Sequence, residues 1–383
     1  MNKNKSEFGS NINLNINSMI EHIINGMTDW VRVIDLDDNL IYVNKSMSNF
    51  LKGDYIGKKC YKAIGRNAPC ENCVSRTAVI SGQPQHKEEI IFDRIYSVMS
   101  SPIKDNDGNT IAIVEVLRDI TDMKKLQKEM LLQNKKLKSE LNMARRLQCS
   151  LLPKNIPEDK IEFSYIYKPC DTLGGDFLDI FEIDTDHIGV YIADVSGHGV
   201  AASMLTVFLS SSIDKNLLSP AAALKKLYKE FNRDYSDQDL YITVFYAIIN
   251  TQNNSLVYSN AGHNVPPIVL NPNSKRFELL RLPGIPISNW VEAPSYKDRN
   301  LSLNKGDKLF LYTDGIVELK NNNSEQFGED RLVCALQNNF NSPSIILNQI
   351  IEAASKFSGT EQYSHVADDI TMALIEIKTS GLL

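Results

Sequence analysis

A segment of about thirty residues, from Met123 to Pro153, contains no glycine and no proline before Pro153 itself. It reads MKKLQKEMLLQNKKLKSELNMARRLQCSLLP and is rich in residues with high helix propensity. The segment therefore predicts one long linker helix over residues 123–152. Because an ordinary domain has roughly 100 to 200 residues, the chain of 383 residues should form one folded unit before this helix and another after it.

The apolar residues of the predicted helix recur at steps of three and four, interrupted by the polar Gln133. They are Met123, Leu126, Met130, Leu137, Leu141, Ala144 and Leu151. This spacing predicts an imperfect two-stranded coiled coil, and therefore a homodimer formed through the linker helix. A solvated connector helix packed on its own domain is the alternative, because the repeat covers few heptads.

Residues 19–122, which follow a polar tail of residues 1–18, contain short strand-like runs separated by turn residues. WVRVID and LIYVN flank Asp37-Asp38-Asn39, and IAIVEVL follows Asp105-Asn106-Asp107-Gly108. These runs predict a small mixed α/β unit. The segments VRVIDLDDNLIYVNKSMSNFLKGDYIGKKC and SSPIKDNDGNTIAIVEVLRDITD resemble a PAS sensor domain, whose exit helix would begin after Arg118-Asp119-Ile120-Thr121.

After Pro153 the sequence is dominated by hydrophobic, strand-like runs. They are IEFSYIY, FLDIFEI, HIGVYIADV, LYITVFYAIIN, SLVYSN, KLFLYTD and ITMALIEI. Helical patterns fall at about 199–213, 220–234, 328–339 and 343–357. Adjacent strands flanked by grouped helices predict an α+β layered domain over residues 153–378, followed by a tail of residues 379–383.

The charge and the N-terminal sequence exclude several classes of protein. Forty-one basic and forty-seven acidic residues give a net charge of −6, which disfavours nucleic acid or an anionic membrane surface as a partner. The first residues, MNKNKSEFGSNINLN, lack the apolar core of a signal peptide, and no run of about 18 apolar residues occurs. We expect a cytoplasmic protein that binds neither nucleic acid nor membrane.

Aspartates stand at four predicted strand ends in the second part of the chain. They are Asp176 after Gly174-Gly175, Asp194 after IGVYIA, Asp314 after LFLYT, and the pair Asp368 and Asp369 before the last strand. Taken singly, an aspartate beside glycine after a strand usually forms a turn. If the four ends converge, however, the carboxylates form an all-oxygen site suited to Mg²⁺ or Mn²⁺.

Five short motifs contain these aspartates or lie between them. They are Gly174-Gly175-Asp176, Asp194-Val195-Ser196-Gly197-His198-Gly199, Asn260-Ala261-Gly262-His263, Tyr312-Thr313-Asp314-Gly315 and Asp368-Asp369-Ile370-Thr371. With the preceding ARRLQCSLLP, they resemble the PPM family of metal-dependent protein phosphatases, in its SpoIIE/RsbU-like branch, over roughly residues 144–377. The resemblance implies an α-β-β-α sandwich, two packed antiparallel sheets with helices outside each, joined to the PAS domain by the long helix.

The resemblance also implies two Mn²⁺ or Mg²⁺ ions and the residues that bind them. The implied ligands are Asp176, Asp194 as the bridging carboxylate, the carbonyl oxygen of Val195, Asp314, Asp368 and, as a further candidate, Asp369. Adjacent strand residues face opposite ways, so only one of Asp368 and Asp369 should point at the metals. A metal pair lowers the pKa of water and neutralises charge on phosphate oxygens, which hydrolysis of a phosphoserine or phosphothreonine ester requires.

His198, close in sequence to Asp194, is a candidate proton donor to the departing alkoxide. An electrostatic or purely structural role for His198 is the alternative. Eukaryotic PPM enzymes grip phosphate with an arginine near the first motif, whereas this chain has only Lys168 there. We therefore expect substrate binding to depend on the metals and on the surface of a protein partner.

By resemblance, the substrate would be a phosphorylated STAS-domain anti-anti-sigma protein, and the sensor would act through the linker helix. Two alternatives remain: a non-catalytic pseudophosphatase that only docks partners, and a different metal-dependent phosphoester hydrolase. The first is disfavoured because every expected ligand position has aspartate. The second is disfavoured by the order of the motifs.

A cysteine cluster in the sensor belongs to none of these motifs. Cys60, Cys70 and Cys73, followed by His86, form the pattern C-x9-C-x2-C-x12-H. The pattern holds enough soft ligands for a zinc site or part of an iron–sulfur site. Reduced thiols without a ligand and a redox sensor are the alternatives.

Overall fold

The computed structural model describes residues 16–154, 158–197, 199–235, 240–271, 273–274, 276–304, 306–337, 341–359 and 368–378. The chain divides into two compact units, and the division falls between Lys136 and Leu137. None of the helices in the described ranges combines the length and apolar composition needed to cross a bilayer.

The first unit is built on a five-stranded antiparallel sheet in the order β2-β1-β5-β4-β3. Its strands are β1 (Trp30–Ile34), β2 (Leu40–Val43), β3 (Gln85–Ile91), β4 (Arg94–Lys104) and β5 (Thr110–Asp119). Its helices are α1 (Ile16–Gly26), α2 (Lys45–Leu51), α3 (Cys60–Ala63) and α4 (Val74–Ser81). The mixed α/β sensor that the sequence predicts is confirmed.

Both predicted aspartate-rich turns of the first unit connect neighbouring strands of its sheet. Each is closed by an aspartate whose carboxylate accepts hydrogen bonds from backbone amides two and four residues later: Asp35 between β1 and β2, and Asp105 between β4 and β5. This is the local geometry that aspartate favours in turns. Local chemistry alone therefore sets these two hairpins.

A buried ion pair ties the middle of this sheet together. Arg32 on β1 and Glu115 on β5 lie 2.5 Å apart, and both side chains are almost fully buried. The carboxylate also accepts hydrogen bonds from Ser75 of α4 and Ser100 of β4. Burial alone would raise the pKa of Glu115, but Arg32 and the two hydroxyls outweigh it and lower that pKa. The pair is thus fully hydrogen-bonded, as a buried charge must be.

Helix α5 (Thr121–Leu151) confirms the predicted long helix, starting two residues before and ending one residue before the expected bounds. Most of its large apolar side chains are exposed: Met123, Leu126, Met130, Leu131, Leu132, Leu137, Met143 and Leu147. Gln148 is its one buried residue among those described. The coiled-coil dimer stays a prediction.

The second unit contains two antiparallel five-stranded sheets, in the orders β13-β10-β9-β8-β7 and β12-β11-β14-β15-β6. The strands of the first are β7 (Phe177–Glu182), β8 (His187–Val195), β9 (Ile242–Asn250), β10 (Ser255–Ala261) and β13 (Arg299–Ser302). Those of the second are β6 (Ile161–Lys168), β11 (Ile268–Asn271), β12 (Arg276–Leu279), β14 (Lys308–Tyr312) and β15 (Ile370–Ile377). The helices are α6 (Val200–Ser212), α7 (Pro220–Tyr235), η1 (Asp314–Ile316), α8 (Gly328–Gln337) and α9 (Pro343–Ser358).

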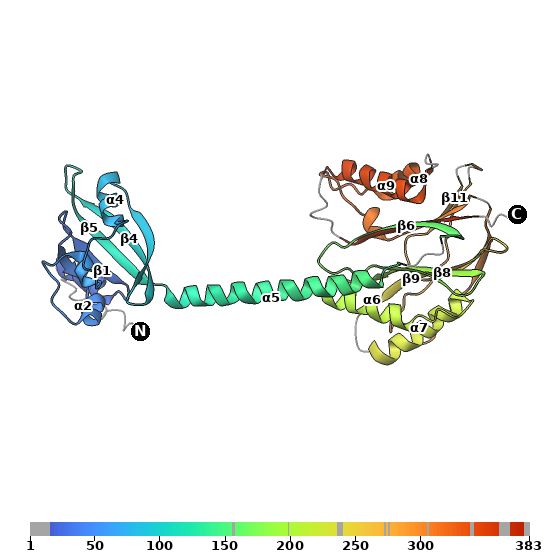
Figure 1. The fold of residues 1–383 in the computed structure, drawn as a ribbon, viewed down its shortest axis with the longest axis horizontal. Coiled ribbons are helices and arrows are strands. Elements are labelled where there is room, and N and C mark those ends of the chain that lie inside the picture. The colour runs from blue at the N-terminus through green and yellow to red at the C-terminus, as the bar shows by residue number, and fades with distance from the viewer. Residues whose placement is uncertain are drawn as a thin grey trace, which may run out of the picture. The chain divides into compact units, whose positions relative to one another are not determined.

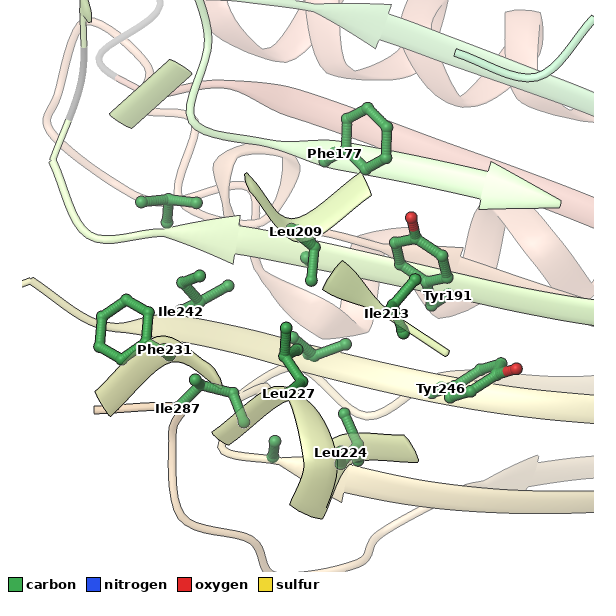
Figure 2. Close-up of a cluster of buried hydrophobic side chains, with 14 of the residues drawn as sticks. Phe177, Tyr191, Leu209, Ile213, Leu224, Leu227, Phe231, Ile242, Tyr246 and Ile287 are labelled. Carbon is green, nitrogen blue, oxygen red and sulfur yellow. The ribbon is translucent and has the colours of Figure 1, made fainter. Parts of the chain in front are cut away.

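Helices cover the outer face of each sheet, so this unit has four layers. Figure 1 shows α6 and α7 beside β8 and β9, and α8 with α9 beyond β6 on the other side. One hydrophobic cluster lies between the two sheets, and one lies under each helical layer. Figure 2 shows the cluster under α6 and α7, where Leu209 and Leu227 pack over Tyr191 and Tyr246 of the sheet. The predicted α-β-β-α sandwich is confirmed.

The central strands β8 and β9 are buried along almost their whole length. Covering on both faces explains why their sequences are continuous apolar runs and not alternating ones. All seven predicted strand segments form strands, and the four predicted helices form within two residues of the expected bounds in the described ranges. The short strands β11, β12 and β13 were not predicted, because four residues carry too little pattern.

Candidate functional site

The register of both sheets places the predicted aspartates at one end of the sandwich. β7 pairs with β8 so that Phe177 lies opposite Ala193. Asp176, just before β7, therefore lies beside Asp194 near the end of β8. In the other sheet Tyr312 lies opposite Met372, which brings the residues after β14 beside those before β15. Asp314, Asp368 and Asp369 occupy those positions.

The charges of these carboxylates act on one another. Burial, followed by Asp194 and Asp369, raises the pKa of Asp176 well above its usual range. Burial and then Asp314, Asp368 and Asp369 raise the pKa of Asp194 to about 8. No positively charged side chain among the described residues offsets this effect on Asp194. The five aspartates thus form one electrostatic group in which negative charge is poorly compensated.

Such a group fits hard cations, because all its donors are oxygen and its charge lacks a partner. In the described ranges, however, no three acidic, histidine or cysteine side chains converge as closely as a bound metal ion requires. Several of the carboxylates are instead engaged in hydrogen bonds. Asp176 Oδ2 accepts from Thr313 Oγ1 at 2.7 Å, and Asp314 Oδ2 accepts from Asn264 Nδ2 at 3.0 Å.

Asp369 is the most constrained of the group. Its Oδ1 accepts from the amide of Cys170 at 2.7 Å, and its Oδ2 accepts from the amides of Gly175 at 2.5 Å and Asp176 at 3.3 Å. The neighbouring Asp368 is exposed and accepts from the amide of Asp369. The two side chains have different surroundings, and Asp369 fixes the loop of residues 170–176.

Two glycines permit the close approach of backbone segments in this group. A Cβ added at Gly315 would lie 2.0 Å from the carbonyl oxygen of Asp369. At Gly175 it would lie 3.0 Å from the carbonyl oxygen of Val195, the predicted main-chain ligand. A larger residue at either position would push these segments apart.

Gln148 of α5 contacts the same loop and was not predicted. Its Nε2 donates to the carbonyl of Gly174 at 2.7 Å and to Thr206 Oγ1 at 3.0 Å. Its Oε1 accepts from the amide of Gly174 at 3.3 Å. Sequence reasoning placed Gln148 within the segment before the first motif, but no pattern distinguished it from the other polar residues there.

Thr313 is a second residue that sequence reasoning missed. It is buried, donates to Asp176 Oδ2, and accepts from the amide of Thr371 at 3.0 Å. It therefore joins the segment after β14 to both Asp176 and β15. The only available signal was its place in the Tyr312-Thr313-Asp314-Gly315 motif.

Two histidines belong to the motifs, His198 and His263. His198, the candidate proton donor, lies outside the described residues. His263 is buried, and its Nε2 donates to the carbonyl of Tyr312 at 2.9 Å. Burial lowers the pKa of His263 to about 4, so the ring is neutral at pH 7 and serves as a structural link between strands.

The side chains of the sensor's cysteine cluster do not converge on a common metal position in the described ranges. Burial raises the pKa of the Cys60 thiol to about 12, Arg66 Nη1 donates to Cys70 Sγ at 3.1 Å, and His86 Nε2 pairs with Ser97 Oγ. None of the Cys60, Cys70, Cys73 and His86 side chains belongs to a metal-holding group in the described ranges. The geometry thus gives no support to the zinc or iron–sulfur alternative, and the cysteines are free thiols.

Comparison with known proteins agrees with this fold. The family model described as Stage II sporulation protein E (SpoIIE) matches residues 184–378, and a PAS domain model matches residues 28–122. The SiaA-PP2C domain of Pseudomonas aeruginosa superposes with a TM-score of 0.57 at 19% identity, over 64% of this chain and 99% of that domain. The second unit thus has a PP2C-type fold. Because the SpoIIE model covers half of the chain, the chain belongs to the SpoIIE family.

Two curated relatives come from Bacillus subtilis (strain 168). The chain is 26% identical over 247 residues to phosphoserine phosphatase RsbP, covering 63% of this chain and 58% of RsbP. It is 28% identical over 191 residues to phosphoserine phosphatase RsbU, covering 49% of this chain and 56% of RsbU. The chain therefore spans less than two thirds of the length of these relatives.

The role of Asp369 can be tested by amide hydrogen exchange. Asp369→Ala removes the acceptors of the Cys170 and Gly175 amides, and losing charged hydrogen bonds of this kind costs about 2 kcal/mol. We expect exchange of both amides to accelerate roughly thirtyfold. Asp368→Ala is the matched control and should leave both amides protected. Unchanged exchange in Asp369→Ala would contradict the anchoring role.

Proposed function

We propose that the chain is a PAS-regulated, divalent-metal-dependent phosphoserine/phosphothreonine protein phosphatase. The observation that carries this proposal is the group of five aspartates at one end of the sandwich, four of them buried or partly buried, where no positively charged side chain among the described residues offsets the negative charge around Asp194. Membership of the SpoIIE family and similarity to two phosphoserine phosphatases support it. In this proposal residues 19–122 are the sensor, 123–152 the linker and 153–378 the phosphatase domain.

Two Mn²⁺ or Mg²⁺ ions would be held by carboxylates of the group. The residues that would hold them are Asp176, Asp194, Val195 through its carbonyl, Asp314 and Asp368. When bound, the metals would activate water near neutral pH and neutralise charge on the phosphate. Asp369, whose oxygens already accept backbone amides, would contribute negative charge and hold the loop in place.

The chain's own residues would keep this arrangement rigid. Asp369 anchors the loop that ends in Asp176, and Thr313 donates to Asp176 and so orients its carboxylate. Asn264 does the same for Asp314. Partners that orient the ligands of a metal are commonly worth 10 to 100-fold in affinity or activity. His198 stays the candidate donor of a proton to the departing seryl or threonyl oxygen.

As substrate we propose a serine- or threonine-phosphorylated STAS-domain protein of a bacterial sigma-factor pathway, in the cytoplasm. The similarity to RsbP and RsbU supports this choice. We further propose that the protein works as a homodimer joined through α5, whose exposed apolar side chains a second helix would cover.

Replacing Asp194 tests the enzyme assignment. Asp194→Ala should lower manganese-dependent phosphate release from a serine-phosphorylated STAS-domain protein by more than about a hundredfold, since even indirect partners of metal ligands are worth that much. Asp184→Ala, in the exposed turn between β7 and β8, is the control and should keep full activity. Equal activity of wild type and Asp194→Ala would remove Asp194 from the site. A folded, metal-binding wild type without activity would identify a pseudophosphatase.

The raised pKa of Asp194 predicts how metal binding depends on pH. Near pH 7 the metal-free protein holds a proton on Asp194, because its pKa is about 8, and a metal ion must displace that proton. Manganese affinity, measured by titration calorimetry, should therefore rise about tenfold per pH unit from pH 6 to 8 and then level off. Affinity that is flat across this range would contradict the charge repulsion described above.

Regulation through the linker helix would act on the contact between Gln148 and Gly174, two residues before Asp176. We propose that a signal in the sensor changes α5 and thereby tightens or releases this contact.

Gln148→Ala removes hydrogen bonds worth about 1 to 1.5 kcal/mol. The manganese concentration for half-maximal activity should rise about tenfold, with little change at saturating manganese. Gln133→Ala on the same helix is the control. A fall in maximal rate with unchanged manganese dependence would contradict this role.

A further inference from the structure

An aromatic pair, the exposed Trp290 and the partly buried Tyr241, borders the aspartate group. Trp290 is 58% exposed, and its ring lies 5.0 Å from that of Tyr241, centroid to centroid, at an interplanar angle of 51°. The other tryptophan of the chain, Trp30, is 6% exposed in the core of the first unit. A large aromatic side chain held at the surface is typical of a binding surface, where tryptophan and tyrosine supply much of the affinity.

The residues immediately before Trp290 are anchored on β9 and α7. Ile287 is fully buried and exchanges two backbone hydrogen bonds with Ile242 of β9, at 2.8 and 2.9 Å. Asn232 of α7 donates to the carbonyl of Ser288 at 3.0 Å. Trp290 therefore stands only two residues beyond a fixed point of the backbone.

The backbone a few residues earlier, on the same N-terminal side of Trp290, is packed just as closely. A Cβ added at Gly284 would lie 1.9 Å from the carbonyl oxygen of Asn260, so the backbones of these two residues are in direct contact. Gly262 has a φ of +77° and faces Pro286, whose Cγ would be 2.4 Å from an added Cβ. The segment that leads into Trp290 is thus held from residue 284 to residue 288, and this lowers the cost of ordering the backbone when a partner binds to the exposed ring.

Tyr241 joins this aromatic pair to the aspartate group. Its carbonyl accepts from the amide of Ser196, and its own amide donates to Ser196 Oγ, both at 3.0 Å. Ser196 follows Asp194 by two residues. The aromatic pair thus lies against the segment that carries the central carboxylate of the proposed phosphatase site.

We infer that Tyr241 and Trp290 dock the protein substrate by packing against an apolar side chain near its phosphorylated residue. The inference rests on the proposed function and assigns a specificity role to residues that do not touch the phosphate. A small phosphoester needs only the aspartate group and its metals. A phosphoprotein also presents the surface around its phosphorylated residue, and the two rings offer that surface an apolar contact beside the site. Val291, 37% exposed, extends the same apolar surface.

The test compares two substrates: a serine-phosphorylated STAS-domain protein and p-nitrophenyl phosphate. Trp290→Ala should lower kcat/KM for the phosphoprotein about tenfold or more, mainly through KM, as expected for a binding hot spot. Hydrolysis of p-nitrophenyl phosphate should change less than about twofold. Trp290→Phe should restore most of the loss. Ile345→Ala, which truncates a residue 46% exposed on α9, is the control and should affect neither substrate.

A direct measurement uses the same residue as its probe. In the full-length Trp30→Phe variant Trp290 is the sole tryptophan, and its fluorescence should change when the phosphoprotein is added without metal. Equal losses on both substrates, or no fluorescence change, would overturn the docking role. So would a wild type that hydrolyses p-nitrophenyl phosphate but not the phosphoprotein. A wild type inactive on both substrates would instead refute the proposed function, which separates the two failures.

Discussion

Mutual repulsion among buried carboxylates is the constraint around which the second unit is built. Asp176 and Asp194 lie near each other and near three more aspartates, and burial followed by the charges of Asp314, Asp368 and Asp369 raises the pKa of Asp194 to about 8. Such a group lowers stability unless backbone donors or cations compensate it. The amides of residues 170–176 supply part of that compensation through Asp369. The negative charge that these amides leave uncompensated is the physical reason for proposing divalent metals.

The rest of the unit serves to hold these charges in place. Two sheets buried on both faces make a rigid base, and hydrogen bonds from Thr313 and Asn264 orient individual carboxylates. Gln148 connects the same loop to α5, the helix that continues from the sensor sheet. A change in α5 can therefore alter the position of Asp176 through the contact between Gln148 and Gly174. The aromatic pair Tyr241 and Trp290, hydrogen-bonded through Tyr241 to Ser196 two residues after Asp194, is the surface proposed for the protein substrate.

Much of this architecture was predictable because it depends on short-range patterns. The two aspartate turns of the sensor, the glycine-free linker and the apolar runs of β8 and β9 each express their structure locally. The resemblance of the aspartate motifs to the PPM family implied that these strand ends would meet. Strands β11 to β13 were missed because they are four residues long. The metal alternative for the sensor cysteines stays a prediction without structural support, because ligand spacing in the sequence does not determine whether side chains converge.

From its sequence alone the chain could be divided into sensor, helix and layered domain. The aspartates of its motifs could be assigned to one metal site by their resemblance to the PPM family. Only the tertiary structure separated the roles of Asp368 and Asp369, and only it revealed Gln148 and the pair Tyr241 and Trp290. Asp369 meets Gly175 across 194 positions of the chain, and Gln148 meets Thr206 across 58. Contacts over such separations leave no periodic pattern in a single sequence, since chain folding and not local propensity brings their partners together.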